Sequence, residues 1–221
     1  MTHLMDYATV DRAPRELMVL LPGALHGPQD FIQQGFVEAV RQRKLCIDVL
    51  LAELDFLDVI DPEALHRFNN ETLQPVLGRG NYSQIRMAGI SIGGYFAMAY
   101  AQHYPQVLTG MLLIAPYPGN RMTTNAISAA GGLAQWQPRE LDKNDTELSN
   151  WNWLKHHAAQ PTEVHLGYGQ EDRFAPSHAM MASVLQDSRV HRVKGGHDWP
   201  AWRQIWQNYL DQHLVLSDDN H

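Results

Sequence analysis

The sequence predicts an α/β fold, in which a mostly parallel sheet carries helices on both faces. Short apolar runs alternate with amphipathic segments along most of the chain, which is typical of strands joined by helical crossovers. The stretch Gly89 to Gly93 matches G-x-S-x-G, the spacing of a serine on a sharp turn between a strand and a helix. Asp172 and His197 each follow a later strand-like run. Ligands bind beyond the carboxyl ends of parallel strands, so we expect these polar residues to meet at one edge of the sheet.

The elements before the serine alternate as this fold requires. Glu16 to Leu21 is a short apolar run ending at Pro22-Gly23, which indicates a buried parallel strand and a turn. Phe31 to Lys44 has apolar side chains on one side and predicts an amphipathic helix, and Leu45 to Leu54 is the next strand. Asp61-Pro62-Glu63 predicts a helix start, with an N-cap, a first-turn proline and an acidic residue near the positive dipole end.

The elements around and after the serine continue this pattern. Tyr82 to Ala88 alternates as a strand, and Ile92 to His103 is rich in Ala and aromatic residues at helical spacing. Further strands are predicted at Val107 to Ala115, Val164 to Tyr168 and Val190 to Val193. A helix from Pro176 to Leu185 separates the last two, and a final helix from Trp199 to Leu214 presents aromatic residues at helical spacing.

The segment from 116 to 160 interrupts the alternation. It holds three of the six tryptophans, Trp136, Trp151 and Trp153, together with a Gly131-Gly132 break and a polar run from 139 to 150. We expect a small helical insertion over the sheet edge, after the strand that follows the serine-bearing helix. The sequence shows no internal repeat, low-complexity tract or linker, so residues 1–221 are expected to form a single domain.

Composition narrows the classes of function. The 221 residues are 44% hydrophobic and 19% charged, as in ordinary globular proteins. The net charge of −7 argues against nucleic acid or an anionic membrane as a partner, and no apolar run is long enough to span a bilayer. The first fifteen residues lack the apolar core of a secretory signal, and the single cysteine, Cys46, reads as a buried strand thiol. A cytoplasmic enzyme is the expectation.

Ser91, Asp172 and His197 have the chemistry of nucleophilic catalysis. A serine hydroxyl is a poor nucleophile unless a base lies beside it. His197 follows Gly195-Gly196, and these glycines allow the histidine to reach back over the sheet. The chain order Ser, Asp, His, with each residue just past a strand, is the one associated with the α/β-hydrolase arrangement.

On these residues the chain resembles the α/β-hydrolase superfamily of serine hydrolases, from about Leu17 to Leu214. The matching positions are Gly89-x-Ser91-x-Gly93-Gly94, Tyr104-Pro105, Gly-x-x-Asp172-x-x-x-Pro176 and Gly195-Gly196-His197. The run from Gly195 to Trp199, with Trp202 three residues on, is similar to the tail of some compact esterases of this superfamily. The resemblance implies an α/β-hydrolase fold and a compact esterase or thioesterase that needs no cofactor.

The resemblance also implies roles for the three residues. Ser91 would attack an acyl carbonyl, His197 would take the hydroxyl proton and pass it to the leaving group, and Asp172 would orient the imidazole. The acid is the least determined of the three. Glu171 is adjacent to Asp172, and Asp198 lies beside the base. Asp172 is preferred because neighbouring side chains rarely face each other productively.

The negative charge that develops on the carbonyl oxygen needs backbone donors. The amide of Ile92, at the positive end of the helix after Ser91, is the first candidate. By resemblance the second is the amide of Ala24, in the turn after the first strand, and Leu25 is the alternative donor. Leu25 and Trp136 are also candidates for substrate contact, although packing of the insertion explains the tryptophan equally well. No metal site is predicted, because the acidic residues and His156-His157 lack convincing ligand spacing.

These observations lead to one function and two alternatives. The first is a serine hydrolase that cleaves small or medium carboxylic esters or thioesters through an acyl-enzyme. Acyl transfer, or another reaction of the same three residues, is the second, and it requires that water be excluded. A binding protein without catalysis is the third, although all three positions hold competent residues. The sequence does not determine the oligomeric state.

Overall fold

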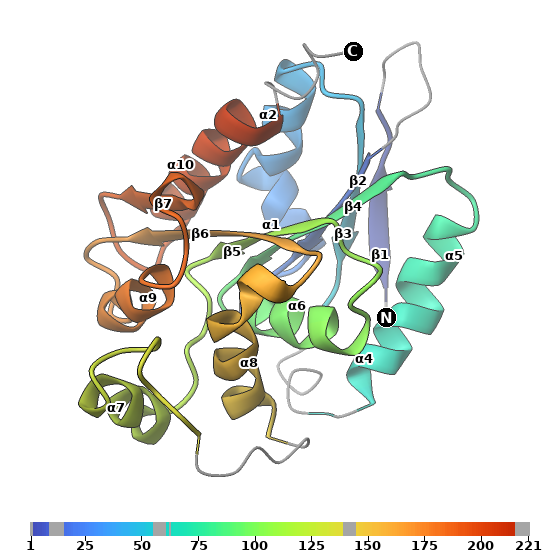
Figure 1. The fold of residues 1–221 in the computed structure, drawn as a ribbon. Coiled ribbons are helices and arrows are strands. Elements are labelled where there is room, and N and C mark those ends of the chain that lie inside the picture. Colours follow the sequence, from blue (N-terminus) through green and yellow to red (C-terminus); the bar gives the residue numbers. More distant parts are fainter. Residues whose placement is uncertain (1, 9–15, 55–60, 62, 139–144, 215–221) are drawn as a thin grey trace.

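The computed structural model describes residues 2–8, 16–54, 61, 63–138 and 145–214 (Figure 1). Within these ranges one seven-stranded sheet has the order β1-β3-β2-β4-β5-β6-β7. The strands are β1 His3–Asp6, β2 Glu16–Leu21, β3 Ile47–Ala52, β4 Gln84–Ile90, β5 Gly110–Ile114, β6 Glu163–Gly169 and β7 Val190–Val193. Neighbouring strands from β3 to β7 pair in parallel. The predicted mostly parallel sheet is therefore confirmed.

Helices cover both faces of this sheet (Figure 1). One face carries α1 Pro28–Gln33, α2 Phe36–Gln42 and α10 Trp199–Tyr209. The other carries α4 Ala64–Arg67, α5 Gln74–Leu77, α6 Ile92–His103, α8 Thr146–Lys155 and α9 Ala175–Ala182. Strand β2 shows the period of two that this arrangement requires. Leu17, Val19 and Leu21 pack in the apolar cluster on the α6 face, while Met18 and Leu20 pack in the cluster on the α10 face. Both faces of the central strands are thus buried in apolar side chains.

Aromatic side chains on α10 fasten the last helix to the sheet. The ring of Trp206 stacks on that of Phe36 at a centroid distance of 5.5 Å, and its indole N–H donates to the Phe36 carbonyl over 3.0 Å. Trp206 and Tyr209 are both buried. Burying one such side chain contributes about 1.5–3 kcal/mol, so these contacts fix the segment that directly follows His197.

The structure corrects the predicted elements at three places. Strand β1 was not predicted; it pairs antiparallel with β3 at the sheet edge. The predicted helix from Phe31 to Lys44 is two helices, because Gly35 adopts a left-handed φ of 78° between α1 and α2. The regular helix after Asp61 begins only at Ala64, although Asp61 Oδ1 accepts the Glu63 N–H over 2.9 Å, as the predicted cap requires; residue 62 lies outside the described residues. The helix continues through a π-helical turn, Phe68–Leu73, into α5.

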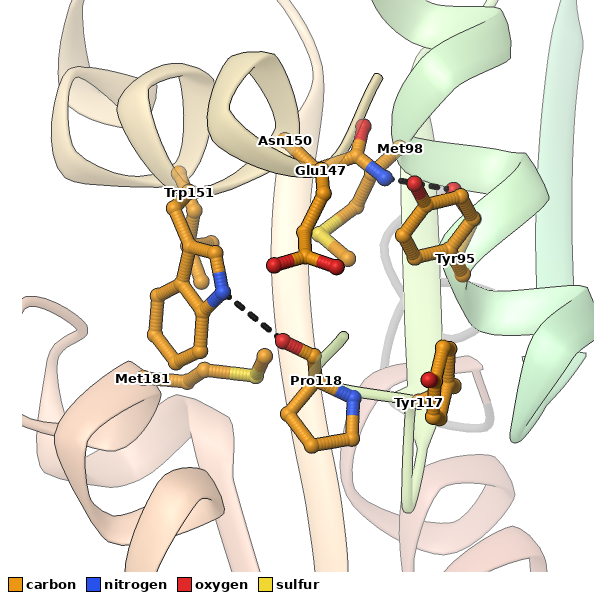
Figure 2. Close-up of a pocket in the computed structure, with 9 residues that line it drawn as sticks. Tyr95, Met98, Tyr117, Pro118, Glu147, Asn150, Trp151 and Met181 are labelled. Carbon is orange, nitrogen blue, oxygen red and sulfur yellow. Dashed lines mark hydrogen bonds between the residues drawn. The ribbon is translucent and has the colours of Figure 1, made fainter. Parts of the chain in front are cut away.

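The segment between β5 and β6 contains α7 Arg121–Ala129, α8 and a 3₁₀ turn, His157–Ala159, so the helical insertion is present; residues 139–144 lie outside the described part. Figure 2 shows how α8 is attached. The indole N–H of Trp151 donates to the Pro118 carbonyl over 2.9 Å, and the side-chain amide of Asn150 donates to the Tyr95 carbonyl over 3.0 Å. The space between these residues is too small to admit a water molecule. Helix α8 is therefore packed directly onto α6 and the chain after β5.

Candidate active site

Ser91 lies on the turn between β4 and α6. Its backbone has φ 52° and ψ −112°, a conformation that non-glycine residues rarely adopt and that costs about 1–3 kcal/mol. Besides the bonds that its carbonyl accepts from the first turn of α6, two hydrogen bonds tie it to β5 and the residues after that strand. The Ser91 N–H donates to the Ile114 carbonyl and the Ser91 carbonyl accepts from the Tyr117 N–H, each over 2.9 Å. The end of β5 and the residues after it thus fix both backbone groups of this strained residue.

The glycines of the turn allow three backbone segments to approach one another. A Cβ on Gly89 would collide with the backbone of Gly93 and Gly94, where α6 begins. A Cβ on Gly93 would collide with the carbonyl groups of Leu21 and Pro22, at the end of β2. Glycine at these two positions therefore brings the turn after β2 against the Ser91 turn.

His197 comes from the loop after β7 and lies beside Ser91. The left-handed φ of 109° at Gly195 turns this loop toward the sheet. The imidazole Nε2 is 3.1 Å from Ser91 Oγ, and Nδ1 is 2.7 Å from Asp172 Oδ2. The rings of Trp202 and Phe174 meet the imidazole edge-on, with centroids at 5.2 and 5.5 Å. These contacts hold the imidazole in one orientation between hydroxyl and carboxylate.

Asp172 follows β6 and is buried, with a side chain that is 0% exposed. Burial raises the pKa of this carboxyl, but hydrogen bonds from His197 and from the Phe174 N–H, together with nearby imidazole charge, outweigh burial and leave the pKa below its ordinary value. The Phe174 N–H donates to Oδ1 over 2.8 Å. The carboxylate therefore stays ionised and keeps the proton of His197 on Nδ1, so that Nε2 is free to accept from Ser91.

The two alternative acids lie elsewhere. Glu171 is exposed, and Asp198 caps α10 by accepting a hydrogen bond from the Ala201 N–H over 3.1 Å. The structure thus brings Ser91, His197 and Asp172 together and gives Asp198 another partner.

The predicted backbone donors lie next to this group. Ile92 is the first residue of α6, and Ala24 is in the turn after β2 that Gly93 allows to approach. Within the described part of the chain neither amide donates to a protein acceptor. Leu25, which follows Ala24, has a φ of 64° and a fully exposed side chain.

Trp136 does not lie with these residues. Its side chain is only 5% exposed and belongs to the apolar cluster on the α6 side of the sheet, and its carbonyl accepts a hydrogen bond from Lys155 Nζ. Of the two readings of this residue, packing of the insertion is the one that its contacts support. Trp136 is therefore a core residue of the insertion.

Sequence reasoning missed residues that support the three side chains. Phe174 donates its N–H to Asp172 and borders the imidazole, and Tyr117 donates its N–H to Ser91. The spacing Asp172-x-Phe174 is typical of an Asx turn and could have indicated the first contact. Nothing in the sequence around Tyr117 indicates the second, because it joins segments that are far apart along the chain.

Three further observations concern a second cavity, metal binding and membrane spanning. A cavity of about 350 Å³ lies between β1, the start of β3 and residues 76–82, at the end of the sheet opposite Ser91. In the described residues no group of three or more His, Cys, Asp or Glu side chains is arranged to hold a metal ion. None of the described helices has the length and apolar character needed to cross a bilayer.

Comparison with known proteins identifies the chain's relatives. The model of the Esterase family, described as "Putative esterase", matches residues 62–212, more than half of the chain. No curated protein matches in sequence.

Solved structures share the fold. The fluorophosphonate-binding serine hydrolase F of Staphylococcus aureus (FphF) is 13% identical, with a TM-score of 0.64 over 95% of this chain and 87% of that one. The S-formylglutathione hydrolase FrmB of the same organism is 15% identical, with a TM-score of 0.65 over 94% and 83%. Est1E of Butyrivibrio proteoclasticus is 14% identical, with a TM-score of 0.64 over 95% and 93%.

Proposed function

The chain belongs to the Esterase family and is a hydrolase, and from this premise we propose that it cleaves carboxylic esters or thioesters with Ser91, His197 and Asp172 as a catalytic triad. The observation that carries the proposal is the continuous contact from Ser91 Oγ to His197 Nε2 and from Nδ1 to a buried carboxylate. This arrangement activates a serine hydroxyl because the base is oriented and within proton-transfer distance.

The reaction follows from the positions of these groups. Ser91 Oγ attacks the acyl carbon while its proton moves to His197 Nε2, and Asp172 stabilises the imidazolium that forms. The proton then passes to the leaving oxygen or sulfur as its bond to the acyl carbon breaks, which leaves an acyl-enzyme. Water, deprotonated by His197, attacks the acyl carbon next, and the acid leaves as Ser91 recovers its proton.

The amides of Ile92 and Ala24 complete the proposed site. We assign them to the oxygen of the tetrahedral intermediate, because Ile92 opens α6 and the turn with Ala24 lies against Gly93. Loss of one such donor typically raises the barrier by about 3 kcal/mol. Leu25, exposed beside Ala24, is proposed to contact the acyl group. We propose small or medium acyl groups as the substrates.

The remaining parts of the proposal concern the organisation and location of the chain. We propose that residues 1–221 act as one domain, in which 116–160 is a helical insertion. A cytoplasmic location is also proposed, and the single cysteine, buried at the start of β3, supports it. Cell fractionation tests the location.

The catalytic proposal is tested by labelling and turnover together. A fluorophosphonate probe should modify the wild-type chain at Ser91, and Ser91→Ala should lose the label and at least about 1,000-fold of its turnover of p-nitrophenyl acetate. Ser128→Ala, which changes an exposed serine on α7, is the matched control and should keep both. Wild-type turnover that persists in Ser91→Ala would refute the assignment. A panel of acyl lengths, as oxygen esters and thioesters, then defines the substrate class.

A further inference from the structure

His178 is a buried histidine near the triad that the chemistry above does not use. It lies on α9 and is 0% exposed. Its Nε2 is 2.9 Å from the Pro116 carbonyl oxygen, while Nδ1 is buried and has no hydrogen-bond partner in the described structure. A carbonyl oxygen can only accept, so the ring proton is on Nε2 and the histidine donates it to Pro116.

Pro116 is part of a backbone clamp around Ser91, formed by residues 114–117. At one end of this clamp the Ile114 carbonyl accepts the Ser91 N–H, and at the other the Tyr117 N–H donates to the Ser91 carbonyl. Pro116 also packs on α6, since a Cβ on Gly94 would lie 3.0 Å from the Pro116 Cβ. The clamp therefore helps to set the position of Ser91, together with the first turn of α6, where the Gly94 and Tyr95 N–H groups also donate to the Ser91 carbonyl.

His178 is connected on its other side to the catalytic acid. Its backbone N–H donates to the Phe174 carbonyl over 3.0 Å, and the Phe174 N–H donates to Asp172 Oδ1 over 2.8 Å. A short series of hydrogen bonds thus runs from Asp172 through Phe174 and His178 to Pro116, in the middle of the clamp. Within this series the His178 side chain joins the loop that carries the acid to the segment that holds the nucleophile.

The imidazole of His178 is neutral near pH 7. Burial lowers its pKa, the Pro116 hydrogen bond and the charge of Asp172 oppose burial, and His197 lowers the pKa further, to about 4. A neutral ring can donate to Pro116 without placing a second positive charge beside the His197–Asp172 pair. A neutral histidine at position 178 can therefore donate to Pro116 from a buried site.

We propose that His178 is a positioning residue, which holds the Pro116 carbonyl and thereby keeps Ser91 Oγ in line with His197 Nε2. The inference rests on the proposed function of the triad. A displacement of about 1 Å at a reacting atom can cost on the order of 100-fold in rate. Loss of the His178 side-chain donor should therefore lower kcat and leave substrate binding nearly unchanged.

The test compares three variants of the full chain on p-nitrophenyl acetate and on the fluorophosphonate probe. His178→Leu removes the donor, and His178→Gln keeps an N–H at similar reach. His157→Leu is the matched control, because His157 is also buried and its Nδ1 also lies 2.9 Å from a backbone carbonyl, that of Leu154 in the insertion. A merely structural role would make the two leucine variants alike: less stable, with normal turnover per folded molecule.

We expect His178→Leu to lose about 10- to 100-fold in kcat and in the rate of Ser91 labelling, with KM within about twofold of the wild-type value. His178→Gln should recover most of this loss, and His157→Leu should keep the wild-type kcat. Normal kcat in folded His178→Leu, or equal losses in the Leu and Gln variants, would overturn the proposal.

A second measurement does not depend on the folding of any variant. In the wild-type protein the ¹⁵N resonances of His178 should show the proton on Nε2 and should not shift between pH 6 and 8. A proton on Nδ1 would overturn the proposal. An inactive and unlabelled wild-type chain would instead refute the triad, so the two failures are distinguishable.

Discussion

The Nδ1 atom of His197 lies 2.7 Å from Oδ2 of Asp172, and the carboxylate at the far end of this contact is fully shielded from solvent. The neighbouring Asp198 points its carboxylate at the start of α10 instead. The two aspartates that could have filled this role thus have separate partners, and substitution at each can be compared.

Asp172→Asn should lower kcat by about 10⁴-fold, because an amide at this position favours the wrong imidazole tautomer while the geometry is kept. Asp198→Asn is the matched control; asparagine caps helices as well as aspartate does, so its kcat should stay within about twofold of wild type. Steady-state kinetics on p-nitrophenyl acetate decide between the two. The assignment fails if Asp198→Asn is the impaired variant.

Gly93→Ala should reduce both stability and activity. Its Cβ would press on the Leu21 and Pro22 carbonyls and push the turn with Ala24 away from Ser91. We expect a loss of about 1–3 kcal/mol in the free energy of unfolding and at least a 10-fold lower kcat. Gly27→Ala serves as the control, since a Cβ there meets nothing within 4 Å and φ is −138°. Urea unfolding and kinetics on the two proteins give the comparison; equal effects would contradict this account.

Stability should fall as the solution is acidified from pH 6.5 toward pH 4, in part because of His178. The folded pKa of about 4 lies below the ordinary histidine value of 6.5, so in this window the unfolded chain binds a proton that the folded protein does not. Stability then decreases by up to about 1.4 kcal/mol per pH unit, and His178 has no such effect above pH 6.5. Urea unfolding at pH 7.0, 5.5 and 4.5 should show a shallower dependence in His178→Gln; an unchanged slope would count against the burial of a neutral imidazole.

The order of strands and helices could be predicted from the sequence because each element of a parallel sheet is a buried apolar run next to an amphipathic helix. Strand β1 gave no such signal. It is a four-residue edge strand that is only partly buried, and its pairing with β3 depends on tertiary contacts. The break at Gly35 was equally hidden, since a glycine within an apolar repeat does not reveal a left-handed φ.

That Ser91, Asp172 and His197 would lie together could be predicted, because each follows a strand and has a glycine within three residues of it. His178 could not. Its neighbours in the sequence resemble an ordinary helix start, and its significance comes from a carbonyl 62 residues away. Contacts between side chains and distant backbone groups leave no periodic trace in a sequence, so supporting residues are harder to find than reacting ones.

Helix α8 is tied to the chain after β5 by Trp151 and to α6 by Asn150, with no room for water between them. Outward movement of α8 would break both hydrogen bonds and expose the buried indole of Trp151 to water. We therefore expect α8 to stay in place while substrate reaches Ser91, so that movement of this helix does not gate the reaction. Product formation should then be linear with time from the moment of mixing, and a lipid–water interface should not raise the hydrolysis rate abruptly.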